Sequence, residues 1–231
     1  MITYTDAQGS DEWLAARRGV ITASKFADAR MKLRGGSPAK VATSYAMNVA
    51  RERAGGTVPS IFQNAAMKTG TEQEPIARLQ YEMETGAMVT EAGFICTDDR
   101  KFGVSVDGLI GEDGLWECKT MVSSDTLFTA LVERDISAYR DQCIGALWLL
   151  HREWIDLSLW CPDLQLLHTV RITRDEQEIW DLETDLLNFE IRVAGYEKSL
   201  RVAMGSAPAD AAPVAPTATA VRAELPEDIF A

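Results

Sequence analysis

Histidine is scarce in this chain, and its cysteines form no metal-binding pattern. The only histidines are His151 and His168, so we expect no histidine-rich metal site. The cysteines are widely spaced and never occur as Cys-x-x-Cys, which argues against structural zinc and iron–sulfur clusters and favours reduced thiols. The four are Cys96, Cys118, Cys143 and Cys161.

Long apolar segments are also missing. No apolar run approaches the length of a membrane span, and the first residues, 1–6, lack the basic and apolar regions of a secretory signal. We therefore expect a cytoplasmic protein without membrane contact. The 231 residues, 46 % hydrophobic and 25 % charged, are enough for one substantial globular domain with a mixed α/β (α+β) fold.

An overall positive charge is absent as well, because the formal net charge is −12. Nucleic-acid-binding proteins are usually basic. Between Arg17 and Lys40, however, seven basic residues face a single acid, Asp28. This asymmetry permits a local phosphate-binding surface on an acidic body, although a solvated helix face explains the charges equally well.

Hydrophobic periodicity and turn residues predict helices and strands over residues 1–205. Helices are expected at 10–18, from about 24 to 31, and at 39–54, 71–84, 124–134, 138–150 and 175–204. Short strands are expected within 88–113, and longer ones at 115–120, 154–161 and 165–172. The pattern is that of a central mixed β-sheet flanked by helices.

The helix expected at 71–84 has two notable features. Pro75 suits its first turn, and Ile76, Leu79 and Met83 share one apolar face. Most of the six tryptophans lie at apolar spacings and are expected in the core. Trp13 is a candidate exception, because it lies one helical turn before Arg17.

Residues 206–231 differ in composition from the rest of the chain. Up to residue 223 they are mostly Ala, Pro, Thr and Val, which predicts a disordered tail. The tail ends in an acidic and apolar tip that includes Ile229 and Phe230. The tip loosely resembles the C-terminal tips of bacterial single-stranded-DNA-binding proteins. It either docks on a partner or has no binding role.

The residues most suggestive of chemistry lie in the middle of the chain. In a strand Glu117 and Lys119 point to the same face, and the preceding turn can bring Asp107 beside Glu117. With the main-chain carbonyl of Cys118, two carboxylates give the oxygen ligands that magnesium prefers. Glu74, on the expected helix, can add a third carboxylate.

This arrangement is typical of a metal-dependent phosphodiesterase. Bound metal polarises the scissile phosphate and lowers the pKa of a bound water, which Lys119 can orient. Without metal the carboxylates repel one another. From these residues alone, a nuclease and a solvated, charged sheet face both stay open.

Five blocks in order resemble the phage lambda exonuclease and YqaJ-type viral recombination nucleases. The resemblance covers roughly residues 10–200. Its first block is Glu12-Trp13 followed by residues 17–24, and the others are Gly70–Pro75, Ser105–Leu109, Glu117–Lys119 and Tyr139–Gln142. The resemblance implies a restriction-endonuclease-like PD-(D/E)xK core. The chain differs from the family pattern at Val106, where proline is usual, and after Lys119, where Cys-Pro is common.

The resemblance also implies roles for individual residues. Asp107, Glu117, the Cys118 carbonyl and Glu74 are the implied ligands of Mg²⁺, with Mn²⁺ as a possible substitute, and Lys119 is the implied catalytic lysine. Gln142 is implied beside the attacking water, and Arg17 with Ser24 at the DNA 5′-phosphate. Taken alone, Ser24 is equally a helix N-cap and Gln142 a surface amide.

The implied activity is a 5′-to-3′ exonuclease on double-stranded DNA ends that leaves 3′ single-stranded overhangs for phage-type homologous recombination. The resemblance further implies a homotrimer that encircles DNA, and a single-strand annealing protein as partner. Two alternatives stay open. One is an endonuclease of the same superfamily, and the other is a catalytically idle DNA-end-binding scaffold.

Overall fold

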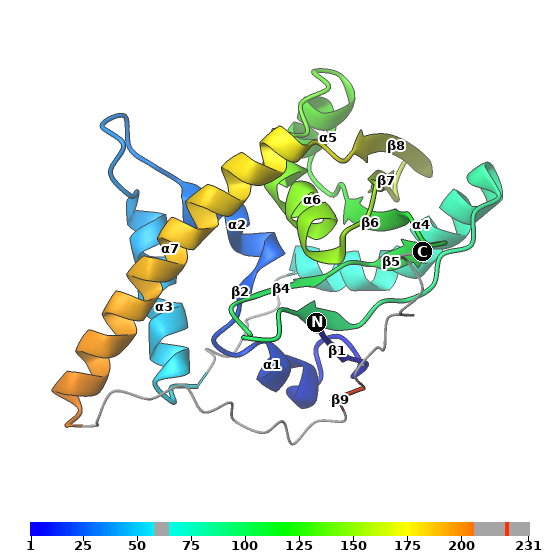
Figure 1. Cartoon of the computed structure of the whole chain (residues 1–231). Coiled ribbons are helices and arrows are strands. Elements are labelled where there is room, and N and C mark those ends of the chain that lie inside the picture. The colour runs from blue at the N-terminus through cyan, green and yellow to red at the C-terminus, as the bar shows by residue number, and fades with distance from the viewer. Residues whose placement is uncertain (58–64, 206–219, 222–231) are drawn as a thin grey trace, which may run out of the picture.

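The computed structural model describes residues 1–57, 65–205 and 220–221 (Figure 1). Apart from Ala220–Val221, the tail expected at 206–231 lies outside the described residues. The described part is a mixed α/β fold with flanking helices, as the sequence predicts, although its strands form two sheets rather than one. Among these residues, no helix is both long and apolar enough to cross a membrane.

The first sheet has the strand order β2-β4-β3-β1-β9. Its strands are β1 (Ile2–Tyr4), β2 (Ile21–Thr22), β3 (Phe94–Cys96), β4 (Phe102–Ser105) and β9 (Ala220–Val221). Only β2 and β4 pair in parallel. The sequence did not predict β1, because its three residues are too few to show an alternating pattern.

The second sheet has the order β5-β6-β7-β8 and is the one that positions the site. Its strands are β5 (Gly108–Ile110), β6 (Gly114–Thr120), β7 (Trp154–Cys161) and β8 (Leu166–Thr173). β6 and β7 are parallel, with Glu117 opposite Leu157, and the other pairs are antiparallel. Because parallel neighbours need a crossover, two helices connect β6 to β7.

Helices cover both faces of this second sheet (Figure 1). Their bounds are α1 (Asp11–Arg17), α2 (Phe26–Arg30), α3 (Lys40–Arg53), α4 (Ala65–Thr85), α5 (Ser124–Leu131), α6 (Ser137–Leu150) and α7 (Glu176–Ala203), with a 3₁₀ turn at Ala23–Lys25. On one face Leu115 joins the main core with Ile144 and Leu147 of α6. On the other face Trp116 packs with Tyr81 of α4.

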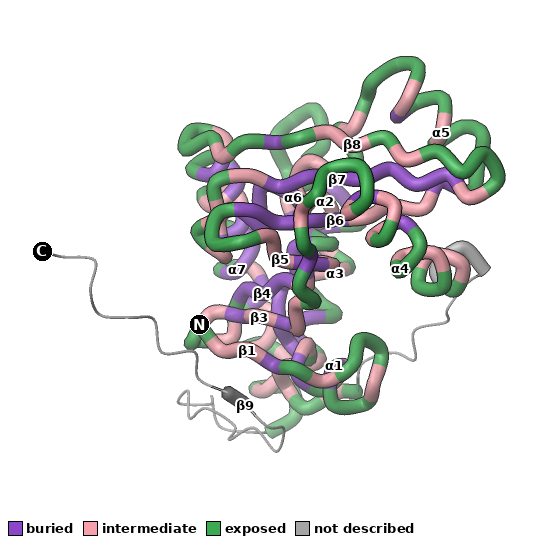
Figure 2. The backbone as a smooth tube through the Cα atoms, turned by 90° about the vertical axis from the view of Figure 1, so that its right-hand side faces the viewer, coloured by how far each residue is buried: buried purple, intermediate pink, exposed green. Residues whose placement is uncertain are grey.

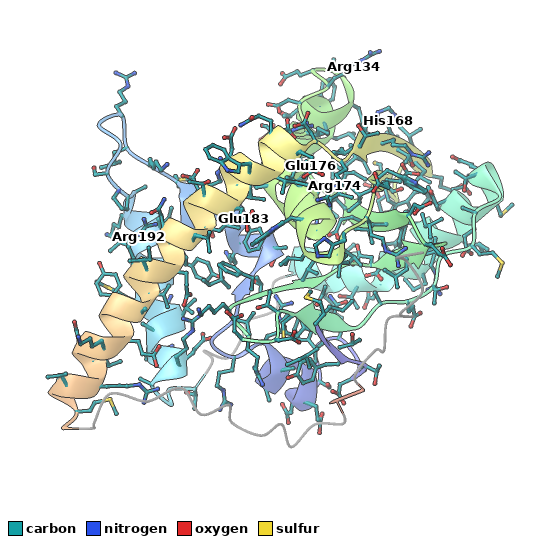
Figure 3. All side chains as sticks on the ribbon, viewed as in Figure 1. Arg134, His168, Arg174, Glu176, Glu183 and Arg192 are labelled. Carbon is teal, nitrogen blue, oxygen red and sulfur yellow. The ribbon has the colours of Figure 1, made fainter. Side chains whose placement is uncertain are left out.

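Buried residues follow β6 and β7 along most of their length (Figure 2). The long helix α7 packs on α2, α3 and α6 at the side of this core. Figure 3 shows Arg174 just before α7 and Arg192 further along it. Arg174 donates to the Leu147 carbonyl of α6, and Arg192 donates to the Ala29 carbonyl of α2, so α7 and the segment before it contact both helices.

Two expectations about helix α4 are wrong. The helix begins at Ala65 rather than near residue 71, so Pro75 lies inside it, where a proline removes one helical hydrogen bond. The residues Ile76, Leu79 and Met83 are 50 %, 59 % and 73 % exposed. The buried face of α4 instead carries Ala77 and Tyr81, which pack against the indole rings of Trp116 and Trp160.

The tryptophans also depart from expectation at two positions. Trp180 on α7 is 62 % exposed rather than part of the core. Trp13, the candidate exception, is buried, and its ring lies 4.2 Å from the guanidinium carbon of Arg17. Trp13 therefore supports an arginine rather than offering a free stacking surface.

Candidate active site

Glu117 is the centre of the candidate active site. Its position on β6 leaves the side chain only 2 % exposed, on the face covered by α6. Its Oε1 accepts hydrogen bonds from Lys119 Nζ at 2.7 Å and from Gln142 Nε2 at 2.5 Å. The alternating strand therefore brings Glu117 and Lys119 together as predicted, and α6 adds Gln142.

Asp107 lies between β4 and β5, at the start of the hairpin that leads into β6. Its Oδ2 accepts a hydrogen bond from the Cys118 backbone N–H at 2.8 Å. This bond spans the hairpin and places Asp107 beside the strand that carries Glu117. The geometry agrees with the prediction that the turn brings the two carboxylates close.

Glu74 approaches the same place from helix α4. Burial, and then the negative charge of Glu117, raise the pKa of the Glu74 carboxyl. Burial, followed by the charges of Glu117 and Glu74, raises the pKa of Asp107 well above its ordinary value. The three carboxylates are thus within electrostatic reach of one another, and their repulsion is incompletely offset by Lys119.

Lys119 is the positive charge of this group. Burial by itself would lower the pKa of its amine, but Glu117 and Asp107 outweigh burial and raise that pKa above its ordinary value. Lys119 therefore stays protonated near neutral pH. In that form it donates a hydrogen bond to Glu117 and can neutralise charge.

The residues present fit a hard divalent cation. Glu117 Oε2 is buried and has no hydrogen-bond partner within the described structure, so this acceptor is available to a ligand. Burial and then Asp107 raise the pKa of the Cys118 thiol, and the side chain packs against the apolar cluster around Trp116. The thiol is therefore a poor ligand, which leaves the Cys118 carbonyl as the oxygen donor of that residue.

The metal site is nonetheless sparse in side chains. Within residues 1–57, 65–205 and 220–221, no group of three or more His, Cys, Asp or Glu side chains is close enough to hold a metal ion. The candidate ligands are the carboxylates of Asp107 and Glu117 and one main-chain carbonyl, and the charge of Glu74 acts on both of these carboxylates. A set limited to oxygen atoms suits magnesium better than zinc.

Arg17 is held rigidly at the end of α1. Its guanidinium carbon lies 4.2 Å from the ring centroid of Trp13 and 5.3 Å from that of Phe94, and Nη1 donates to Ser105 Oγ at 3.1 Å. Burial lowers the pKa of Arg17 to about 10. The bond to Ser105 connects Arg17 to the segment that carries Asp107, two residues further on.

Ser24 lies in the 3₁₀ turn that follows β2. Helix N-cap positions nearby belong to Thr22 and Lys25, so the interpretation of Ser24 as an N-cap is wrong. Its exposed hydroxyl lies 3.5 Å from Thr22 Oγ1. The alternative for Gln142, a surface amide, is also wrong, because its side chain is partly buried and bonds Glu117.

Two residues near Arg17 were missed by the sequence reasoning. Ser105 accepts the hydrogen bond from Arg17, and the Tyr45 hydroxyl accepts one from the Thr22 N–H at 3.1 Å. Burial raises the pKa of Tyr45 to about 12. Ser105 belongs to the same block as Asp107 and could have been found there, whereas nothing in the sequence around Tyr45 singles it out.

Comparisons with known proteins find a matching family and similar solved structures. Residues 12–152 match the YqaJ-like viral recombinase domain family. The crystal structure of an alkaline exonuclease from Laribacter hongkongensis is similar with a TM-score of 0.75 and 32 % identity, covering 85 % of this chain and 98 % of that one. The same enzyme has been solved in complex with dAMP.

A more distant structure shares the fold. A phage related exonuclease from Haemophilus somnus 129PT is similar with a TM-score of 0.63 and 15 % identity, covering 80 % of this chain and 96 % of that one. No curated protein sequence matches this chain. Both similar structures are covered by this chain over nearly their full length.

Proposed function

This chain belongs to the YqaJ-like viral recombinase domain family, and from that premise we propose that it is a magnesium-dependent exonuclease acting on double-stranded DNA ends. It degrades the 5′-phosphorylated strand in the 5′-to-3′ direction and leaves a 3′ single-stranded overhang for homologous recombination. The nuclease assignment follows from the family. Metal dependence, polarity and product are the proposed refinements.

The observation that carries the proposal is the bonding of Glu117. One of its oxygens accepts from both Lys119 and Gln142, while the other is buried with no partner in the described structure. A buried carboxylate oxygen without a partner is costly in a folded protein unless a ligand satisfies it. A bound cation would do so and would also relieve the repulsion from Asp107.

The side chains around Glu117 have separate tasks in phosphodiester hydrolysis. Asp107, Glu117 and the Cys118 carbonyl would hold Mg²⁺, or Mn²⁺ in its place, with Glu74 as an outer carboxylate. The ion supplies polarisation of the scissile phosphate and a lower pKa for the attacking water. Lys119 and Gln142 orient that water, and protonated Lys119 neutralises charge that develops on the phosphate.

The proposed polarity rests on Arg17 and Ser24. Arg17 is a cation stacked on Trp13, and a planar guanidinium suits phosphate recognition. Ser24 presents an exposed hydroxyl in the turn after β2. The Ser105 bond links Arg17 to the Asp107 segment, so a 5′-phosphate bound here would leave the first phosphodiester near Glu117.

We also propose that the active form is a homotrimer in the cytoplasm that encircles duplex DNA and works with a single-strand annealing protein. A ring that encloses its substrate accommodates the net charge of −12 on its exterior better than an open groove does. Light scattering coupled to size exclusion would test the assembly. Particles of about three times the 25.4 kDa chain mass would support it.

The function is tested with linear duplex DNA labelled on one strand and carrying either a 5′-phosphate or a 5′-hydroxyl. We expect release of mononucleotides that requires Mg²⁺, is abolished by EDTA and is faster from the phosphorylated end. Opening of a closed circular duplex would show an endonuclease instead. Asp107→Ala should abolish degradation and retain end binding; an unchanged rate would mean that the site lies elsewhere.

A further inference from the structure

Helix α4 is attached to the second sheet by two hydrogen bonds from side chains. At one point the Tyr81 hydroxyl donates to Asp156 Oδ2 at 2.6 Å, and both side chains are buried. At the other, Trp160 Nε1 donates to Gln73 Oε1 at 3.0 Å. Asp156 and Trp160 lie on the same face of β7, and Gln73 and Tyr81 lie on the same face of α4.

The spacing of these two bonds is matched on helix and strand. Eight residues separate Gln73 from Tyr81, a rise of about 12 Å along a helix. Four residues separate Asp156 from Trp160, a length of about 13 Å along a strand. The pairing therefore fixes both the position of α4 along β7 and its rotation, since a slip of one residue would turn the helix by about 100°.

Asp156 is itself fixed from the opposite side. Arg171, its cross-strand neighbour on β8, donates to both carboxylate oxygens at 2.8 Å. The guanidinium carbon of Arg171 lies 3.7 Å from the ring centroid of Trp154. Tyr81 thus bonds a carboxylate that the sheet already holds in place, so the hydroxyl is a rigid attachment point for the helix.

The apolar contacts that Ala77 and Tyr81 make under α4 end at an open hollow near Gln73. This hollow of about 550 Å³ lies beside the Gln73–Trp160 bond and is lined by Gln73, Ile76, Gln80, Trp160, Pro162 and Gln165. Glu74, the next residue after Gln73, is repelled by Glu117 across the site. Without the two bonds, we expect the Gln73 end of the helix to relax toward the hollow and to carry Glu74 away from Asp107 and Glu117.

We propose that Tyr81 and Gln73 are positioning residues that hold Glu74 at the metal site by docking α4 on β7. This inference rests on the proposed function, and neither residue touches substrate or metal. Loss of the two bonds should weaken cation binding while leaving Lys119 and Gln142 in place. The expected phenotype is a greater metal requirement with a nearly unchanged rate once metal is saturating.

The test uses Tyr81→Phe, Gln73→Met and the double variant in the full chain. Binding of Mg²⁺ alone is measured by calorimetry, and activity is titrated with Mg²⁺. We expect the double variant to raise the Mg²⁺ dissociation constant at least tenfold, with kcat at saturating Mg²⁺ within about threefold of the parent. Gln80→Met is the matched control and should change neither value, because the Gln80 amide bonds Glu84 of its own helix.

A second comparison separates positioning from general stability. Glu74→Gln should weaken Mg²⁺ binding, and adding Tyr81→Phe to it should weaken binding no further, since the two changes act through one carboxylate. Additive losses, or a folded double variant that binds Mg²⁺ like the parent, would overturn the proposal. A parent chain that binds Mg²⁺ yet degrades no DNA would overturn the proposed function and leave the positioning role standing.

Discussion

At the scale of single residues, the clustered carboxylates of the candidate site destabilise the folded, metal-free protein. Asp107, Glu117 and Glu74 are held within electrostatic reach, and the positive charges of Lys119 and, at Glu74, of Arg78 offset their repulsion in part. Like charges confined in this way destabilise the folded state until a counter-ion binds. Sites that accept such strain are generally those that use it for binding or catalysis.

Asp107→Asn should therefore stabilise the metal-free protein while it abolishes nuclease activity. The raised pKa of Asp107 means that its charged form is disfavoured in the fold, and Asn keeps an acceptor for the Cys118 N–H. We expect thermal unfolding in EDTA at pH 8 to move up by about 3 °C.

Asp99→Asn is the matched control for this change. Although burial acts in the opposite direction, hydrogen bonds from Thr97 and Lys101 lower the pKa of Asp99, so its charged form is favoured in the fold. The control should move the unfolding temperature down. A fall with Asp107→Asn would contradict the repulsion argument.

Arg17→Lys should reduce the preference for a 5′-phosphorylated end without abolishing hydrolysis. Lysine keeps the charge but loses the planar guanidinium that faces Trp13 and bonds Ser105. We expect the rate ratio between 5′-phosphate and 5′-hydroxyl substrates to fall about tenfold, equivalent to about 1.4 kcal/mol. Arg18→Lys, at the exposed neighbouring position, should leave the ratio unchanged. An unaltered ratio in both variants would remove Arg17 from the phosphate site.

At the scale of elements, charged contacts join segments that are distant in the sequence. Asp185 on α7 accepts from Arg30 at the end of α2 and from Lys32 in the following loop. Arg30 also donates to Asp141, the neighbour of Gln142 on α6. Arg30 and Lys32, two of the basic residues between Arg17 and Lys40, therefore join elements of the fold. Neither sequence-based interpretation of this basic region, a phosphate-binding surface or a solvated helix face, had predicted this role.

Asp185→Asn should lower stability at neutral pH and have no effect in acid. Burial acts to raise the pKa of Asp185, but Lys32 and Arg30 outweigh it and hold that pKa below its usual range. The contribution to the free energy of unfolding is therefore complete above the unfolded-state pKa near 4 and is lost as pH falls through the folded-state value. We expect a loss of about 1 kcal/mol or less at pH 7 in chemical denaturation.

The pH dependence of that loss provides the decisive comparison. Below about pH 3 the variant and the parent should unfold at the same denaturant concentration. Asp181→Asn on the same helix is a suitable control, because Asp181 accepts a hydrogen bond from Gln177 of its own helix. A difference that persists unchanged in acid would mean that the ion pairs do not stabilise the loop.

The elements near the site were predictable where a short motif fixes them locally. Strand alternation and a hairpin place Asp107, Glu117 and Lys119, and the family block places Gln142. The attachment of α4 was not predictable, because Tyr81 and Asp156 are 75 residues apart and neither forms a recognisable motif. The apolar pattern of α4 even indicated the opposite face.

At the scale of the whole molecule, the core is complete before the tail begins. In the described structure the last residue of the main core cluster is Val193, and α7 ends at Ala203. The family match ends at residue 152. Beyond residue 205, only Ala220 and Val221 are described, and they pair with Tyr4 and Thr3 at the edge of the first sheet.

Removal of residues 206–231 should therefore leave the nuclease intact. Among the described residues, the truncation removes no member of the main core cluster and two cross-strand pairs with β1, each worth less than about 1 kcal/mol. We expect the thermal midpoint to change by less than about 4 °C and exonuclease rates to stay within twofold. A collapse of activity would instead mean that the tail is needed for catalysis.

Phe230→Ala in the full chain tests the acidic and apolar tip separately. Loss of co-purification with a single-strand annealing protein, at an unchanged exonuclease rate, would assign the tip to that partner.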